Sequence, residues 1–177
     1  YLLPVLSKKI SSLNILSTLR VTIAFGSPAA VINGFGVLFP RNQGFTALGV
    51  LANTSIFTHR GNHWNESWIM GGANAPSNLA DLPDTEVLNL VLKDREKLLG
   101  VSDSPSRFHV TRWPKAFVHY DLNLEESLPL TFLGSPWEGK AFLTGNYLGS
   151  LGLSKMLDKS AKLANRIVNL ISTERDL

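Results

Sequence analysis

The chain has no cysteine, and several other features are also missing from its 177 residues. Without cysteine it forms no disulfide, no thiolate metal site and no cysteine nucleophile. No apolar run reaches the ~18 residues of a membrane-spanning helix, because Arg, Asn, Gly or Pro interrupts each one. The net charge of +3 is spread along the chain without a basic block, which argues against nucleic-acid binding. What is present is a globular composition, 44% hydrophobic and 18% charged, sufficient for one domain with a core.

A dinucleotide-binding start is missing as well. The nearest approach to GxGxxG begins at Gly34 and Gly36, but Phe39 replaces the third glycine and Pro40 stands where a helix should begin. There is no GxSxG elbow and no Walker sequence. The chain also starts at Tyr1, with neither a methionine nor a basic-then-apolar leader. We therefore expect it to be a piece of a longer protein.

The first half of the chain has the pattern of a β-sheet. From residue 19 to 25, apolar residues alternate with polar ones, which is the period of a half-buried strand. Short apolar runs between turn residues predict further strands at residues 34–40, 47–52, 64–70 and 108–112. Trp113-Pro114 is expected to end the last of these. The spacing of the three runs at 34–40, 47–52 and 64–70 predicts an antiparallel meander.

Two segments follow the helical period instead. Residues 84–99 form an amphipathic helix that begins after Pro83, carries acidic residues in its first turn and stops at Gly100. A second helix is predicted from residue 151 to about 172, after a short strand at 141–144. Its expected buried face consists of Leu153, Leu157, Ala161, Ala164, Ile167, Val168 and Ile171. The fold class is therefore expected to be α+β, a mixed or antiparallel sheet with packed helices.

The glycine-rich entry into the last helix, residues 145–153, is the strongest candidate for a ligand site. A helix N-terminus has unpaired N–H groups and a positive dipole end, and glycine lets a ligand approach the backbone closely. Such a terminus can face a phosphate or the N1–C2=O edge of a flavin. An ordinary strand-to-helix turn with glycine at tight positions explains the same pattern, and the residues alone favour that explanation.

Two weaker candidates lie elsewhere. His59 and His63 have i,i+4 spacing but flank Gly61 in a predicted loop, so we expect a surface loop and no metal site. The last helix also carries a basic stripe, which predicts a solvated face or, less directly, contact with anionic lipid. The stripe consists of Lys155, Lys159, Lys162 and Arg166.

Taken in order, these segments resemble the C-terminal part of protoporphyrinogen oxidase, an FAD-dependent family of haem and chlorophyll synthesis in the flavin amine oxidase superfamily. No single motif is decisive, but their shared order and spacing are specific. The matching segments are residues 34–40 (the family's GFGxLvP strand), 48–51 (LGxxxxS), 70–72 (LGG), 84–100 (the next helix and its LG stop), 113–120 (W-x-x-A-x-PQY) and 145–149 (GNYxG).

The resemblance implies a domain organisation. Residues 1–135 would be the C-terminal half of a substrate-binding domain, and residues 136–177 would return to the FAD domain with a final strand and helix. The family's Rossmann unit and its helical membrane-docking insertion would lie outside this chain. We therefore expect the isolated chain to be inactive and to bind FAD weakly or not at all.

The resemblance also implies site residues. Leu38, Leu51 and Ile69 fall where the family places apolar side chains around its tetrapyrrole, which suits a large and mostly apolar substrate. No side chain is given a catalytic role, since the flavin carries the redox chemistry, and no metal is implied. The family's arginine for a substrate propionate would lie upstream of this chain. The implied FAD contacts are Gly145, Asn146, Tyr147, Gly149, Ser150, Leu151 and Gly152.

The implied reaction is the oxidation of protoporphyrinogen IX to protoporphyrin IX in two-electron steps, with FAD reoxidised by oxygen. Departures from the family pattern occur at Val118-His119, at residues 154–156 and at residues 159–161. They leave open a coproporphyrinogen oxidase or another flavin amine-oxidase-like enzyme. A non-catalytic porphyrin-binding or scaffold module, and one half of a two-chain enzyme, are the remaining alternatives.

The expected partners are the tetrapyrrole substrate and the protein's own N-terminal FAD-binding half. A peripheral membrane contact and a homodimer stay open, and nucleic acid is not expected. The lack of cysteine fits an intracellular protein. Together with the resemblance it predicts a location in the cytoplasm or peripherally on the inner membrane.

Overall fold

The computed structural model describes residues 11–59, 61, 63–73, 75–122, 124, 140–148 and 152–175. The chain divides into two compact units, one of residues 16–116 and one of residues 1–15 with 117–177. The expected domain boundary near residue 135 stays a prediction. Among the described residues, no helix has both the length and the apolar character needed to cross a bilayer.

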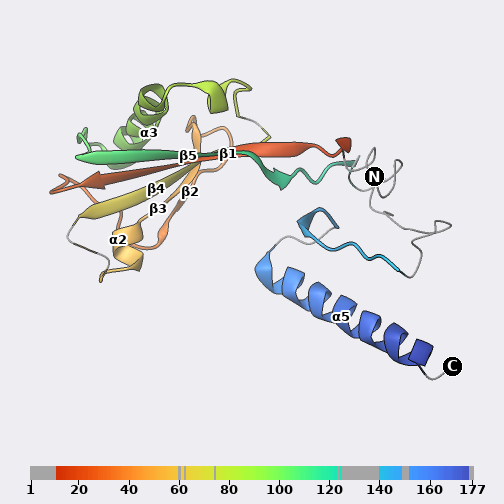
Figure 1. Ribbon diagram of the computed structural model, residues 1–177. Helices are drawn as coiled ribbons and strands as arrows, with labels where there is room; N and C mark the ends of the chain where they lie inside the picture. The colour runs from red at the N-terminus through yellow and green to blue at the C-terminus, as the bar shows by residue number, and fades with distance from the viewer. Residues whose placement is uncertain are drawn as a thin grey trace. The chain divides into compact units, whose positions relative to one another are not determined.

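The larger unit is built on a five-stranded sheet in the order β2-β3-β4-β1-β5 (Figure 1). β2, β3 and β4 form the expected antiparallel meander, and β1 is antiparallel to β4 on its other side. β5 runs against β1, since the N–H of Ser106 donates to the carbonyl of Ala24 at 2.8 Å. The α+β fold class is confirmed, although the meander prediction did not include the placement of β1. The strands are β1 (Ile15–Phe25), β2 (Gly36–Leu38), β3 (Ala47–Leu51), β4 (Trp64–Gly71) and β5 (Arg107–Val118).

The register of β1 against β4 separates a buried face from an open one. Leu19 and Val21 lie opposite Met70 and Trp68, and all four are buried. Side chains alternate between the two faces of a strand, so the residues between them point the other way. Helix α3 (Asp84–Leu99) covers the buried face, where Val87 and Val91 join the core. Figure 1 shows α3 and the short helix α2 (Asn53–Ile56) on opposite sides of the sheet.

Helix α3 has the bounds that the sequence predicts. It follows Pro83, has Asp84 and Glu86 in its first turn and Lys97 in its last, as the helix dipole favours. Gly100 ends the helix in the left-handed region, with φ of 72°, and its N–H donates to the carbonyl of Glu96 at 2.8 Å. Glycine adopts this conformation without the steric cost that other residues have.

A buried ion pair joins α3 to the middle of the sheet. Arg95 and Glu66 have no measurable exposure, and the Nε of Arg95 lies 3.2 Å from both carboxylate oxygens of Glu66. The indole N–H groups of Trp64 and Trp68 donate to the same carboxylate at 3.1 and 3.0 Å. The guanidinium also lies over the ring of Phe25, 4.3 Å from its centre. The buried carboxylate is therefore fully surrounded by donors.

The other end of the Arg95 guanidinium holds two loops. Its Nη1 donates to Asp103 at 2.8 Å, and its Nη2 donates to the carbonyl of Ala30 at 2.8 Å. The backbone N–H of Ala29, and then Arg95, hold the pKa of Asp103 below its ordinary value of 3.8. The segment after β1 and the segment after α3 are thereby attached to one side chain. The neighbouring Asp94 acts similarly on the start of β3, where it accepts the backbone N–H of Ala47 at 2.7 Å.

Three strands have bounds that differ clearly from the prediction, and the first is β1, which begins at Ile15 rather than at residue 19. β5 continues through Trp113-Pro114 to Val118, because it lies at an edge of the sheet, where proline's missing N–H breaks no ladder. β2 is reduced to residues 36–38 of the expected 34–40. The expected strand at 141–144 is wrong, since these residues belong to no strand and none of the described strands pairs with them.

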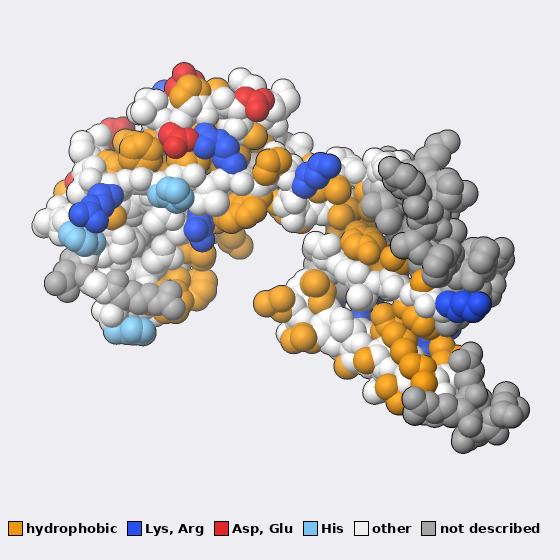
Figure 2. All heavy atoms as spheres, viewed as in Figure 1, with side chains coloured by type: hydrophobic (Ala, Val, Ile, Leu, Met, Phe, Trp, Pro, Cys, Tyr) orange, Lys and Arg blue, Asp and Glu red, His pale blue; other side chains and the backbone are white. Residues whose placement is uncertain are grey.

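The smaller unit contains helix α5 (Leu153–Arg175) and a little core of Leu13, Val118 and Leu124. The expected buried face of α5 is wrong, because Leu153 is 78% and Leu157 70% exposed. Figure 2 shows hydrophobic side chains uncovered along this helix. An amphipathic stripe is buried only where another surface packs on it, and the described residues supply little such surface.

We expect Arg95→Met to lower the free energy of unfolding by about 3–5 kcal/mol, because it leaves the Glu66 carboxylate buried without its cation. Adding Glu66→Gln should restore part of this loss, since the amide needs no counter-charge. Urea unfolding of both single variants and the double variant, arranged as a double-mutant cycle, measures the coupling. Additive losses would contradict a buried ion pair.

The lowered pKa of Asp103 predicts an acid-sensitive contribution to stability. The folded state binds this proton less tightly than the unfolded chain, so Asp103 stabilises the fold above about pH 4 and loses this effect as the pH falls through its lowered pKa. Asp103→Asn should therefore flatten the fall in urea midpoint between neutral and acidic pH. Asp158→Asn, at an exposed carboxylate on α5, is the control and should leave the slope as it is. Equal slopes for wild type and Asp103→Asn would rule out this role.

Candidate functional site

Three predicted substrate residues lie together on the open face of the sheet. The register places Leu38 opposite Gly49, Gly49 opposite Ile69, and Leu51 opposite Ser67. Opposed residues share a face, and Ile69 alternates with buried Trp68, so all three apolar side chains point away from α3. We call Leu38, Leu51 and Ile69 the apolar strip.

Exposure and a missing side chain make the apolar strip accessible. Leu38 is 86% and Leu51 37% exposed, so both side chains are accessible from solvent. A Cβ on Gly49 would lie 3.1 Å from Cδ2 of Leu38 and 2.7 Å from the carbonyl oxygen of Val37. Glycine at this position therefore allows β2 to pack closely on β3 and lets Leu38 lie over the sheet.

A polar hollow of about 340 Å³ is another feature of the open face. The period-two pattern of β1 is predicted from the sequence, but its outward-facing residues are not among the predicted site residues. That alternation, which places Arg20 and Thr22 opposite the core face, was the available signal. The hollow is lined by Arg20, Thr22, Asn53, Thr54, Phe57, Asn65 and Ser67.

The glycine turn before α5 is explained in part by its own packing. Gly145 has φ of 152°, and a Cβ there would lie 2.5 Å from the ring of Tyr147. Tyr147 packs against the small core of its unit, and the hydroxyl of Tyr120 donates to the carbonyl of Asn146 at 2.5 Å. Of the two explanations for this glycine, the structure supports the tight turn: its missing side chain makes room for Tyr147.

Gly152 differs from Gly145 because the space beside it is open. Its φ is 92°, a Cβ there would meet no described atom within 4 Å, and its carbonyl accepts the N–H of Met156 at 3.1 Å as α5 begins. This is the geometry that lets a ligand approach the first turn of a helix. The predicted FAD contacts Gly149, Ser150 and Leu151 lie outside the described residues.

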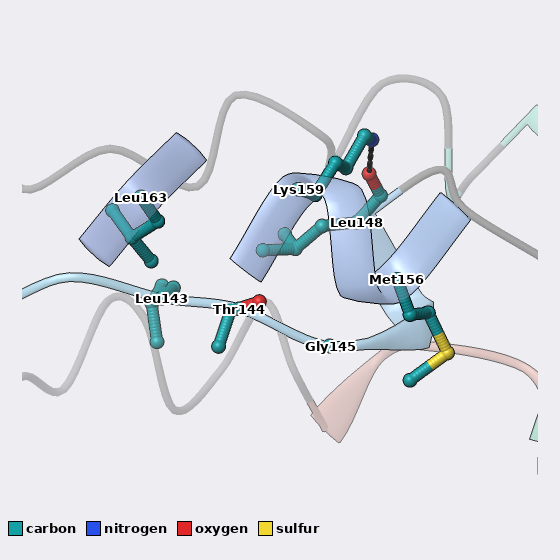
Figure 3. Close-up of a pocket in the computed structure, with 7 residues that line it drawn as sticks. All are labelled: Leu143, Thr144, Gly145, Leu148, Met156, Lys159 and Leu163. Atoms are coloured by element: carbon teal, nitrogen blue, oxygen red, sulfur yellow. Dashed lines mark hydrogen bonds between the residues drawn. The ribbon is translucent and has the colours of Figure 1, made fainter. Parts of the chain in front are cut away.

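A cavity of about 240 Å³ lies between residues 143–148 and the first turns of α5. In Figure 3, Leu163 points from the helix toward the extended segment that carries Leu143. The dashed line in the figure is the bond from Nζ of Lys159 to the carbonyl of Leu148, at 3.0 Å. The walls are mostly apolar, which suits a flat organic ring more than a phosphate. The lining residues are Leu143, Thr144, Gly145, Leu148, Met156, Lys159 and Leu163.

The remaining candidates have local explanations or stay predictions. In the basic stripe, Lys162 pairs with Asp158 at 2.8 Å and Arg166 lies 5.9 Å from the ring centre of Phe142. Within the described part of the chain, no three metal-ligating side chains form a cluster, and this includes the surroundings of His59 and His63.

Comparison with known proteins finds similar sequences along most of the chain. No protein-family profile matches the chain. Protoporphyrinogen oxidase 2 of Arabidopsis thaliana is 28% identical over 165 residues, which is 89% of this chain and 32% of that protein. The chain is also similar in sequence to protoporphyrinogen oxidase 1 of Arabidopsis thaliana, with 29% identity over 80% of this chain and 27% of that protein. Coproporphyrinogen III oxidase of Bacillus subtilis is also similar, at 22% identity over 90% of this chain and 35% of its own.

A solved structure supports the fold of the chain. The crystal structure of a protein from Exiguobacterium sp. 255-15, assigned as a protoporphyrinogen oxidase, aligns with a TM-score of 0.70 at 19% identity. The alignment covers 96% of this chain and 37% of that one. The chain spans about a third of the length of the curated relatives it matches.

We expect Gly145→Ala to loosen the turn before α5, because alanine resists this φ and its Cβ would collide with Tyr147. The local opening free energy should fall by about 1–3 kcal/mol, the usual scale of such strain. Hydrogen exchange of the amides in residues 145–148 and 153–160 measures this. Thr144→Ala, one residue away, is the control and should exchange like wild type.

Proposed function

We propose that this chain supplies the substrate side and the last flavin-side turn of an FAD-dependent porphyrinogen oxidase. The substrate would be protoporphyrinogen IX and the product protoporphyrin IX. The observation that carries the proposal is the apolar strip, three side chains from three strands on the open face of the sheet. The homology to protoporphyrinogen oxidases supports the same assignment.

The residues of this chain would bind and shield rather than react. A porphyrinogen is a broad apolar macrocycle, and the strip offers Leu38, Leu51 and Ile69 as a surface for it that excludes water. Gly152 and the first amides of α5 would face the flavin, and the cavity at Leu143 and Leu163 would border it. The flavin, when bound, accepts the hydride equivalents. The uncovered apolar face of α5 would pack on the N-terminal FAD-binding half.

Coproporphyrinogen is the second candidate substrate. The similarity to the Bacillus subtilis coproporphyrinogen III oxidase extends over 90% of this chain, about as far as the similarity to the Arabidopsis protein. The two porphyrinogens differ in their number of carboxylates. The apolar strip could contact the macrocycle of either porphyrinogen. The contacts made by the carboxylate substituents would therefore determine which substrate is preferred.

The test is an oxidase assay on the complete gene product that contains this chain. Under air, that protein should turn protoporphyrinogen IX into fluorescent protoporphyrin and should carry flavin, seen by its absorbance bands. The chain of 177 residues alone should do neither. Flavin without porphyrinogen turnover would point to another flavin oxidase, and a flavin-free product would point to the porphyrin-binding or scaffold module.

We expect Ile69→Lys to raise KM for the porphyrinogen by about tenfold or more, because the macrocycle would have to desolvate a charge at the centre of the strip. kcat should change much less, since the flavin chemistry is elsewhere. Asn89→Lys adds the same charge to the exposed side of α3, on the covered side of the sheet, and should leave KM as it is. An unchanged KM in Ile69→Lys would remove the strip from the substrate site.

A further inference from the structure

The polar hollow on the open face is built from three parts of the larger unit. Arg20 and Thr22 come from β1, and Asn65 and Ser67 from β4. The register sets Thr22 directly opposite Ser67, with their hydroxyl oxygens 3.4 Å apart. α2 closes one side with Asn53, whose Nδ2 donates to the Oγ of Ser67 at 2.7 Å. The floor is therefore ordered by hydrogen bonds before any ligand enters.

The hollow carries one positive charge, and none of its lining residues is acidic. Within the described part of the chain, no carboxylate lies within ion-pair distance of Arg20. Its guanidinium instead lies over the indole of Trp113, 5.6 Å from the ring centre. Stacking on an aromatic face orients a guanidinium while leaving its N–H groups free to bind an anion. Glu66 of β4 does not compete for Arg20, because its carboxylate points to the opposite face of the sheet and binds Arg95.

The remaining donors of the hollow also favour an anion. The Nδ2 of Asn53 uses one of its two N–H groups on Ser67, and the second is left for a ligand. Since Ser67 accepts that bond through its oxygen, its own O–H can donate to Thr22 or to a ligand. A planar carboxylate matches this set, because a guanidinium can bind both of its oxygens while an amide and a hydroxyl donate to the same group.

We propose that this hollow binds a carboxylate of the substrate, with Arg20 as the charged anchor and Asn53, Thr22 and Ser67 as orienting donors. The apolar strip lies beside it, because Ile69 is opposite Arg20 and Leu51 is opposite Ser67. A ligand with a broad apolar body and a carboxylate arm fits that combination, with Phe57 on the wall of the hollow. The identity of this ligand rests on the proposed function: the carboxylate is then a propionate of the porphyrinogen.

Binding of protoporphyrin IX to the full chain tests the assignment, using quenching of tryptophan fluorescence. Its dimethyl ester has the same macrocycle without the charges, and both compounds are delivered in the same detergent. Arg20→Met should weaken binding of the free acid by about tenfold, the usual scale for a charge-assisted hydrogen bond, and leave the ester unchanged. Lys93→Met removes one positive charge from the exposed side of α3 and should change neither affinity.

Asn53→Asp is a second variant that keeps the shape of the hollow. The Ser67 hydroxyl can donate to the new carboxylate, so the floor stays connected, but the added negative charge repels an anion. Binding of the free acid should fall at least as much as in Arg20→Met. Thermal midpoints check that both variants are folded. Unaltered affinity for the free acid in folded Arg20→Met and Asn53→Asp overturns the assignment, and equal losses for acid and ester do so as well.

A small probe separates this assignment from the proposed function. Naphthalene-1-carboxylate has the charge and a flat ring without the macrocycle, and its neutral amide is the matched control. In NMR titrations, the acid should shift the Arg20 Nε–H and the Trp113 indole N–H, and these shifts should be absent in Arg20→Met. Such shifts in a chain that fails to bind porphyrin would support the carboxylate site while the porphyrin assignment fails. If porphyrin binds and the Arg20→Met change has no effect, the porphyrin assignment holds and the carboxylate site fails. If millimolar phosphate alone displaces the probe, the hollow is only a general anion site.

Discussion

The larger unit depends on one buried side chain, Arg95. Its guanidinium contacts the carboxylate of Glu66 in β4, Asp103 beyond α3, and the carbonyl of Ala30 after β1. Removing such charges from water is costly, and it is tolerated only because each donor and acceptor has a partner. Among the described residues, no buried side-chain nitrogen or oxygen lacks a hydrogen bond. α3 is thereby held on one face of the sheet in a single position.

The two faces of the sheet therefore have different roles, since one contributes to stability and the other is exposed. The covered face contains the core and the buried ion pair of Arg95 and Glu66, which contribute stability. The open face keeps its hydrophobic strip and Arg20 uncovered, although burying the strip would be favourable by itself. Exposed apolar patches of this kind mark binding sites more often than they add stability. The covered face therefore has to provide the stability that the open face does not.

Local sequence patterns predicted most of the helices and strands, but some of the predicted strand ends were wrong. α3 is confirmed to the residue because its proline start, acidic first turn and glycine stop all lie within its own sequence. The predicted strand at 108–112 is shorter than β5. A strand can continue through Pro114 only at a sheet edge, and only the sheet order shows that β5 lies there. The buried cluster had a signal that was missed. Glu66 occupies a core position in the alternation of β4, and Arg95 lies on the same helical stripe as Val87 and Val91.

By itself, the sequence determined the α+β class, the positions of the long elements and the resemblance that the homologues confirm, because periodicity and turn residues act over short distances. It also named the apolar strip, whose members the structure brings onto one face. Only the tertiary structure decided that β1 pairs with β4, which sets Arg20 opposite Ile69 and Thr22 opposite Ser67. The β1–β4 pairs join residues between 39 and 53 positions apart. Their register depends on which face packs against α3, and no local spacing records that.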